Sequence, residues 1–142
     1  MPERFVLDSF ALMALFQNEP GAPKVEALLE KASKGECQVF ISAVNLGEVA
    51  YAVEGRRGLQ AAQEALSAID QAAIQIVDVD RTLALMAARL KATTGMGYAD
   101  CFAAALAQRL DAAVLTGDPD FQRLEGAVPV EWLRADNGYG NG

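Results

Sequence analysis

The stretch Arg4-Phe-Val-Leu-Asp-Ser-Phe-Ala-Leu-Met-Ala-Leu-Phe16 decides the fold class, because it passes from a buried strand into an apolar helix through one aspartate. The apolar run before Asp8 predicts a short strand over Arg4–Asp8, and the residues after it predict a helix over Phe10–Gln17. Asn18-Glu-Pro-Gly21 ends that helix. A strand that leads directly into a helix is the unit from which parallel sheets are built.

The same alternation continues along the chain. Further strands are predicted at Gln38–Ile41, Ile74–Val77, Ala112–Thr116 and Val128–Glu131. Helices are predicted from Pro23 to Gly35, from Ser42 to Val53, over Leu59–Ile69, Asp80–Ala92 and Ala99–Leu110, with Gly55-Arg-Arg-Gly58 expected as a turn. This order predicts a single α/β domain over residues 1–134, with a parallel sheet flanked by helices on both faces. Residues 135–142 are expected to form a disordered tail.

Composition excludes several classes of protein. The apolar run Phe10–Phe16 is far shorter than the roughly 20 residues that cross a bilayer, so no membrane span is expected. Asp8 interrupts the apolar stretch near the N-terminus where a secretory signal needs continuity, so we expect a cytoplasmic protein. Cys37 and Cys101 form no C-x-x-C pair, which argues against a thiolate zinc site and a disulfide framework.

The chain contains no histidine. This removes the usual general base, the usual zinc ligand and every Ser-His or Cys-His nucleophile pair, so any chemistry must depend on carboxylates. The formal net charge of −7 argues against a domain that grips nucleic acid by bulk electrostatics.

Four acidic residues are expected to reach one edge of the sheet. Asp8 ends the first strand, Glu48 lies about two turns into the helix after the second, Asp100 opens the alanine-rich helix and Asp118 follows the fourth strand. Right-handed crossovers bring the carboxyl ends of parallel strands to one edge, where ligands of α/β sheets bind.

Each acid also has a purely structural explanation. Asp8, Asp100 and Asp118 are possible helix N-caps, and Glu48 is placed to close a capping box with Asn45. Taken singly, capping is the better explanation of each acid. Taken together, three chain segments and a neighbouring helix converge on the ligand-binding edge, which favours a functional cluster.

Clustered carboxylates call for a cation. Two of them about 4 Å apart repel by about 1 to 4 kcal/mol, depending on the local dielectric. Oxygen ligands without His or Cys select hard ions, so Mg²⁺ or Mn²⁺ is expected. Two such ions would change the formal charge from −7 to −3 and could activate water for phosphodiester hydrolysis.

At these residues the chain resembles the PIN-domain nucleases, and among them the VapC toxins of type II toxin–antitoxin pairs. The resemblance rests on four stretches and covers about Phe5 to Val130: Phe5-Val-Leu-Asp-Ser-Phe-Ala-Leu12, Asn45-Leu-Gly-Glu48, Tyr98-Ala-Asp-Cys-Phe-Ala-Ala104 and Leu115-Thr-Gly-Asp-Pro-Asp-Phe121. It implies that Asp8, Glu48, Asp100 and Asp118 are catalytic metal-binding acids, supported by the hydroxyls of Ser9 and Thr116. It further implies a five-stranded parallel sheet, a homodimer, and cleavage of RNA under the control of a VapB-like antitoxin.

Three other residues are weaker candidates. Asp120 is placed as a support behind the four acids, or as a first-turn carboxylate that favours the helix dipole. Arg56 and Arg57 are the best local candidates for contacts with RNA phosphates, although a solvated basic turn explains them more simply.

The leading hypothesis is therefore a metal-dependent endoribonuclease that acts as a toxin. One alternative is an aspartyl-type phosphatase, but that class wants a second acid two residues after Asp8, where Phe10 stands. Another is a catalytically weak protein used as a binding module. The apolar stripes Leu12, Leu15, Phe16 and Val25, Leu28, Leu29 are expected to be core, and some of them could form a groove for an antitoxin helix.

Overall fold

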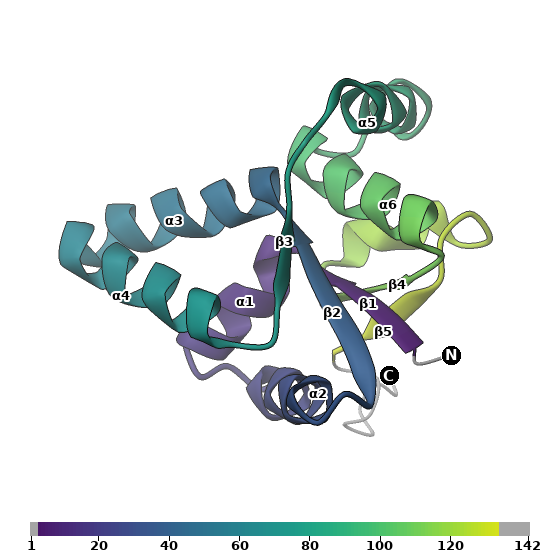
Figure 1. Ribbon diagram of the computed structural model, residues 1–142. Helices are drawn as coiled ribbons and strands as arrows, with labels where there is room; N and C mark the ends of the chain where they lie inside the picture. The colour runs from purple at the N-terminus through teal and green to yellow at the C-terminus, as the bar shows by residue number, and fades with distance from the viewer. Residues whose placement is uncertain (1–2, 134–142) are drawn as a thin grey trace.

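Five parallel strands form one sheet in the computed structural model, which describes residues 3–133 (Figure 1). The strands are β1 (Glu3–Leu7), β2 (Cys37–Ser42), β3 (Gln75–Val77), β4 (Ala113–Thr116) and β5 (Val130–Trp132). Their order across the sheet is β3-β2-β1-β4-β5, with β1 in the centre. The predicted α/β fold with a five-stranded parallel sheet is confirmed. The tail predicted at residues 135–142 lies outside the described residues.

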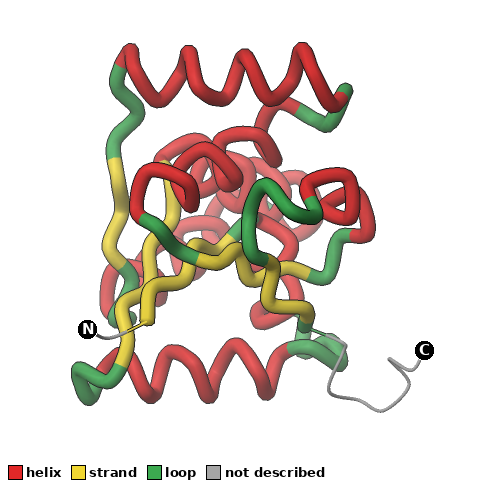
Figure 2. The backbone as a smooth tube through the Cα atoms, turned by 90° about the vertical axis from the view of Figure 1, so that its right-hand side faces the viewer, coloured by secondary structure: helices red, strands yellow, loops and turns green. Residues whose placement is uncertain are grey.

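Helices cover both faces of this sheet. They are α1 (Ser9–Phe16), α2 (Ala22–Ser33), α3 (Ala43–Arg57), α4 (Leu59–Gln71), α5 (Arg81–Thr94), α6 (Tyr98–Leu110) and the 3₁₀ helix η1 (Pro119–Leu124). Figures 1 and 2 show α5 and α6 on one side of the strands and α2 on the other. The strands alternate accordingly: Val6 packs with α6 and Phe5 and Leu7 pack with α1 and α2, as a period of two residues requires.

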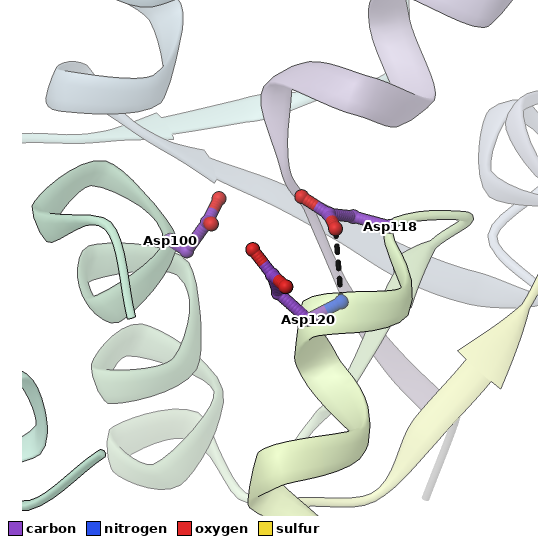
Figure 3. Close-up of side chains that lie close together, drawn as sticks. All are labelled: Asp100, Asp118 and Asp120. Carbon is purple, nitrogen blue, oxygen red and sulfur yellow. Dashed lines mark hydrogen bonds between the residues drawn. The ribbon is translucent and has the colours of Figure 1, made fainter. Parts of the chain in front are cut away.

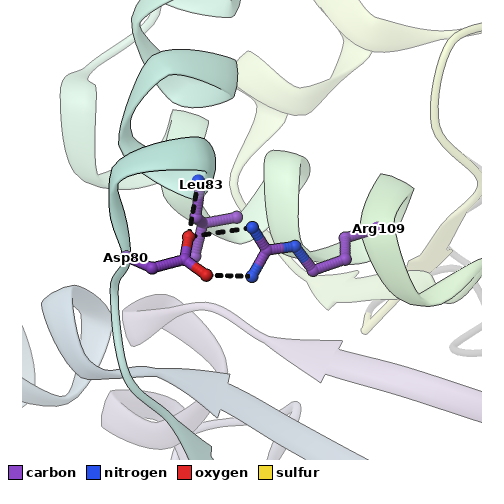
Figure 4. A network of polar contacts seen from close by, with 3 residues as sticks. All are labelled: Asp80, Leu83 and Arg109. Atoms are coloured by element: carbon purple, nitrogen blue, oxygen red, sulfur yellow. Dashed lines mark hydrogen bonds and ion pairs between the residues drawn. The ribbon is translucent and has the colours of Figure 1, made fainter.

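The alanine-rich helix α6 is the most deeply buried of the described helices. Every residue from Cys101 to Ala107 is buried, because the sheet, α5 and α3 all pack against it and its small side chains allow close approach. At its far end, Arg109 forms a bidentate ion pair with Asp80, whose Oδ1 also accepts a 2.8 Å hydrogen bond from the Leu83 amide (Figure 4). This contact fixes the start of α5 against the end of α6.

The expected turn at Gly55-Arg-Arg-Gly58 is wrong in its extent. Helix α3 continues through Gly55 to Arg57 and ends only at Gly58, whose φ of +93° separates α3 from α4. A glycine inside a helix costs only about 1 kcal/mol relative to alanine, and the packing of α3 on α4 outweighs that cost. Both arginines therefore lie in the last turn of a helix.

No helix among residues 3–133 combines the length and the apolar character needed to cross a membrane.

Candidate active site

The strand order reverses between β1 and β4, and this reversal determines where the site lies. The chain runs from β1 toward β3 on one side of the sheet and returns through β4 and β5 on the other. Loops diverge at such a point and leave a crevice at the carboxyl ends of the two strands. Asp8 follows β1 directly, and Asp118 stands two residues after the end of β4.

Three carboxylates meet above this crevice. Asp100, Asp118 and Asp120 each contribute one oxygen, and these three oxygens all lie within 4.8 Å of one another (Figure 3). Asp100 stands in the first turn of α6, and the other two flank Pro119 at the start of η1. The Asp120 amide donates a 2.9 Å hydrogen bond to Asp118 Oδ1, which folds η1 back so that both side chains face Asp100.

Glu48 faces the same space from α3. Ser9 Oγ donates a 2.6 Å hydrogen bond to its Oε1, so the start of α1 holds the carboxylate in place. A cleft of about 360 Å³ opens here, lined by Ser9, Phe10, Met13, Gln17, Glu19, Glu48, Arg56, Asp100 and Asp118. Three of the four acids proposed from the sequence therefore share one cleft.

Asp8 lies beneath the cleft and differs from the other acids. It is only 1% exposed, and both of its oxygens are engaged: Oδ1 accepts from the Ala11 amide and Oδ2 accepts from the Thr116 hydroxyl. The same Thr116 oxygen accepts a 2.9 Å hydrogen bond from the Asp118 amide. A continuous chain of hydrogen bonds thus connects Asp8 to the loop that carries Asp118.

Burial and mutual repulsion raise two of these pKa values. Loss of solvent is the main cause that raises the pKa of Asp8 to about 7, against the lowering effect of the Thr116 and Ala11 hydrogen bonds. The pKa of Asp100 is raised to about 6, first by desolvation and then by the negative charges of Asp118, Glu48 and Asp120. The site is thus short of positive charge at neutral pH.

The structural explanations hold for some of these acids and fail for others. Asp8 caps α1, and Asp118 caps η1 through the Asp120 amide. Asp100 caps nothing, because Gly97 is the N-cap of α6. The expected capping box of Glu48 with Asn45 is wrong, since Ser42 caps α3 by accepting from the Asn45 amide. Asp8 and Asp118 therefore cap helices and also contribute carboxylates to this edge of the sheet.

The two arginines face different surroundings. Among residues 3–133, Arg56 is the one basic residue that lines the acidic cleft, and its guanidinium lies beside the Gln17 amide. Arg57, one residue on, does not line that cleft but lines a neighbouring apolar groove between α1, α3 and α4.

Sequence reasoning gave Asn45 no role at the site beyond the capping box. Its side chain is fully buried, accepts from the Ser42 hydroxyl and donates a 3.0 Å hydrogen bond to the carbonyl of Ala99. It thereby joins α3 to α6 one residue before Asp100 and three residues before Glu48. The available signal was a carboxamide within the Asn45-Leu-Gly-Glu48 stretch, but its partner 54 residues away is visible only in three dimensions.

The donor set fits a hard divalent cation. Three carboxylate oxygens within 4.8 Å match the oxygen ligands that Mg²⁺ and Mn²⁺ prefer. The chain offers no imidazole, and Cys37 and Cys101 are buried elsewhere in the core. The negative charge of the cluster also needs a cation to offset it.

The sequence matches the family model of the PIN domain over residues 5–127. No curated protein sequence is similar enough to count as a match.

Solved structures share the fold at low sequence identity. VapBC2 from Rickettsia felis, bound to a DNA fragment from its promoter, has a TM-score of 0.72 at 17% identity, over 90% of this chain and 97% of the other. The Sarcin-Ricin loop cleaving toxin VapC20 from Mycobacterium tuberculosis has a TM-score of 0.71 at 18% identity, over 89% and 98%. FitAcB from Neisseria gonorrhoeae has a TM-score of 0.66 at 19% identity, over 91% and 97%.

At these identities the likeness shows the fold alone. The aspartyl phosphatase alternative loses support, because the family model that matches is a different one. Since that model spans most of the sequence, the chain belongs to the PIN domain family.

Proposed function

We propose that this protein is a metal-dependent endoribonuclease and the toxin of a toxin–antitoxin pair. The observation that carries the proposal is the group of three carboxylates, Asp100, Asp118 and Asp120, at the crevice of a PIN domain. The M. tuberculosis structure of the same fold is described as a toxin that cleaves the Sarcin-Ricin loop, which supports RNA as the substrate. Such an enzyme would act on RNA in the cytoplasm.

Asp100, Asp118 and Asp120 would hold Mg²⁺ or Mn²⁺, with Glu48 beside them in the cleft. When bound, such an ion supplies an activated water and offsets negative charge at a phosphodiester. Ser9 keeps the Glu48 carboxylate oriented toward the cleft. Asp8 orders the β4 loop through Thr116 and adds its charge from below, so its contribution combines positioning with electrostatics.

Arg56 is proposed to contact a phosphate of the RNA. It is the basic residue lining the cleft, and a guanidinium matches phosphate geometry well. Arg57 lines the apolar groove instead, so its part in RNA binding is proposed to be minor.

The proposed partners are a VapB-like antitoxin and a second copy of this chain. Structures of similar fold are VapBC complexes from R. felis and Salmonella typhimurium. An apolar groove of about 220 Å³ shares Met13, Gln17 and Arg56 with the acidic cleft, so a partner helix seated there would also block the site. Of the stripe residues that could form such a groove, Phe16 lines it, whereas Leu12 and Val25 are fully buried core.

The proposal is tested by incubating the purified protein with single-stranded and structured RNA in Mg²⁺, in Mn²⁺ and after exhaustive EDTA treatment. We expect cleavage with either ion and none after chelation. Asp118→Asn should abolish cleavage, whereas the matched control Asp70→Asn, an exposed carboxylate on α4, should leave it unchanged. Full activity after chelation would contradict the metal-dependent mechanism, and no cleavage of any RNA would contradict the nuclease.

A further inference from the structure

An aromatic ring stands exposed on the wall of the acidic cleft. Phe10 remains 37% exposed, while the next two residues of α1, Ala11 and Leu12, are fully buried. It lines the cleft together with Glu48, Asp100 and Asp118. The exposed part of Phe10 therefore presents an aromatic surface to a space lined by carboxylates, where a ligand can contact it.

The β4 loop is shaped to receive this ring. A Cβ atom on Gly117 would lie 2.5 Å from Phe10 Cε1 and 3.0 Å from Cζ, so no other residue fits without displacing the ring. Gly117 has no positive φ, and its backbone would accept any residue. The lack of a side chain at Gly117 therefore lets the Phe10 ring pack closely against the loop that carries Asp118.

Other exposed aromatic residues of the described chain lie off the cleft. Among residues 3–133, Tyr51 is 68% exposed and Tyr98 is 46% exposed, and neither lines the space that holds the acids. The Tyr98 ring packs edge-on against Phe102, with ring centroids 4.8 Å apart. Phe10 alone among these three combines exposure with proximity to the site.

A nucleobase is the ligand that suits this ring. The cleft carries Glu19, Glu48, Asp100 and Asp118 against one arginine, so RNA phosphates gain little from charge there. Stacking of a base on an aromatic face does not depend on charge and is available to every base that is unstacked from its neighbours. We propose that Phe10 is the platform on which a base flanking the cleaved phosphodiester stacks, so that the ring places this bond beside the carboxylates.

This inference rests on the proposed ribonuclease function and makes it more specific. A base can reach Phe10 only after it leaves a duplex, so the platform selects single-stranded segments and loops. Stacking on Phe10 also contributes affinity for RNA, which a protein with a net charge of −7 does not gain from bulk electrostatics.

The test uses a single-stranded RNA that the wild-type protein cleaves, once the cleaved bond has been mapped. Phe10→Leu keeps an apolar side chain but removes the aromatic face, and we expect kcat/KM to fall roughly five- to hundredfold, as loss of one stacked base implies. Phe10→Trp should retain activity. Tyr51→Leu, which removes an exposed aromatic ring away from the cleft, is the matched control and should behave as wild type.

Abasic nucleotides on either side of the cleaved bond identify the stacked base. One of them should reduce wild-type cleavage about as much as Phe10→Leu does, and should cost that variant nothing more. Should Phe10→Leu not fold, Gly117→Ala serves instead, because it displaces the ring without changing it, and the abasic penalty should shrink there too. In a folded Phe10→Leu background, Gly117→Ala should add little.

The outcomes separate the two proposals. Wild-type protein that cleaves no RNA overturns the proposed function and the platform with it. Wild-type protein that cleaves, with Phe10→Leu equally active or equally sensitive to the abasic substitution, overturns the platform alone. Loss of partner binding without loss of cleavage in Phe10→Leu would assign the ring to a protein contact and would overturn it as well.

Discussion

Asp8 and Asp100 lie at the same edge of the sheet, but their carboxyl groups have different surroundings. Asp8 is buried with both oxygens hydrogen-bonded, which leaves it little freedom to bind anything else. Asp100 is half-buried, forms no cap and faces Asp118 and Asp120. Both residues are aspartates at the same edge of the sheet, so the environment of each carboxylate decides its role.

Replacing Asp100 by Asn separates stability from activity. A folded pKa of about 6 exceeds the ordinary value of 3.8, so ionised Asp100 destabilises the metal-free fold above that pKa. A shift of this size is worth about 3 kcal/mol for a fully buried group, and solvent screening of a half-buried one leaves about 1 kcal/mol. Asp100→Asn should therefore raise the metal-free melting temperature at pH 7.5 by roughly 3 °C, while cleavage falls more than about a hundredfold.

The pH dependence of this gain in melting temperature provides a control for the prediction. Well below pH 3.8, the ordinary pKa of the group, the carboxyl is protonated in both the folded and the unfolded chain, so the gain in melting temperature should vanish there. Asp70→Asn, on the exposed face of α4, should show no gain at either pH. An Asp100→Asn variant with unchanged stability at pH 7.5 and retained cleavage would leave Asp100 with no part in a charged site.

Activity should depend on pH through the same groups. Protons compete with the metal for Asp100, whose pKa is about 6, and they neutralise Asp8, whose pKa is about 7. At subsaturating Mn²⁺ the cleavage rate should therefore fall as the pH drops from 8 to 5, by about tenfold per unit once below pH 6 if one proton controls binding. A higher Mn²⁺ concentration should move the midpoint to lower pH, and a flat profile from pH 8 to 5 would contradict this competition.

At the scale of elements, the contact between α3 and α6 holds Glu48 and Asp100 at a fixed separation. Asn45 bridges the two helices through Ala99, and this contact is buried. Asn45→Leu should leave the Ala99 carbonyl without its donor, at a cost of about 1 to 3 kcal/mol, and should also weaken Mn²⁺ binding. Asp80→Ala, which removes the cap of α5 and its ion pair with Arg109 but leaves Asn45 and Ala99 untouched, should reduce stability with much less effect on Mn²⁺ affinity. Calorimetric titration and thermal melts of both variants would show whether the effect on the metal is specific to the bridge.

The elements themselves could be predicted from periodicity and end signals. The apolar run before Asp8 and Pro23 in the first turn of α2 both act as the sequence indicates. The end of α3 could not be predicted, because a glycine inside a helix and a glycine that ends one differ only in backbone conformation. Gly55 remains helical, and the φ of +93° occurs at Gly58.

Within the site, sequence could indicate which carboxylates reach the edge but could not give their mutual distances. Asp120 was expected behind the others, and the structure places one of its oxygens within 4.8 Å of one oxygen each of Asp100 and Asp118. The reason is η1, a tight turn closed by the hydrogen bond from the Asp120 amide to Asp118. Burial of Asp8 likewise depends on Thr116, 108 residues away in the sequence. Short turns and distant partners of this kind leave no periodic signal.

For the whole molecule, the fold gathers part of the negative charge in one crevice. The strand order brings several of the 19 acidic residues to one crevice, so repulsion is concentrated where the sheet provides no packing to offset it. A cation bound there relieves this repulsion, and metal binding should therefore stabilise the entire domain.

Metal binding should appear as a shift in global unfolding, because a ligand that binds only the folded state raises its stability by RT ln(1 + [L]/Kd). At a Mn²⁺ concentration a hundred times Kd this is about 2.7 kcal/mol, or roughly 8 °C for a domain of this size.

NaCl at equal ionic strength screens the carboxylates without filling the site, so it should raise the melting temperature less and without saturation. Asp100→Asn should lose most of the Mn²⁺ response but keep the response to NaCl, since only the first requires the three oxygens together. Equal shifts with Mn²⁺ and NaCl in the wild-type protein would mean that the cluster responds to ionic strength alone, and the carboxylates would then form no metal site.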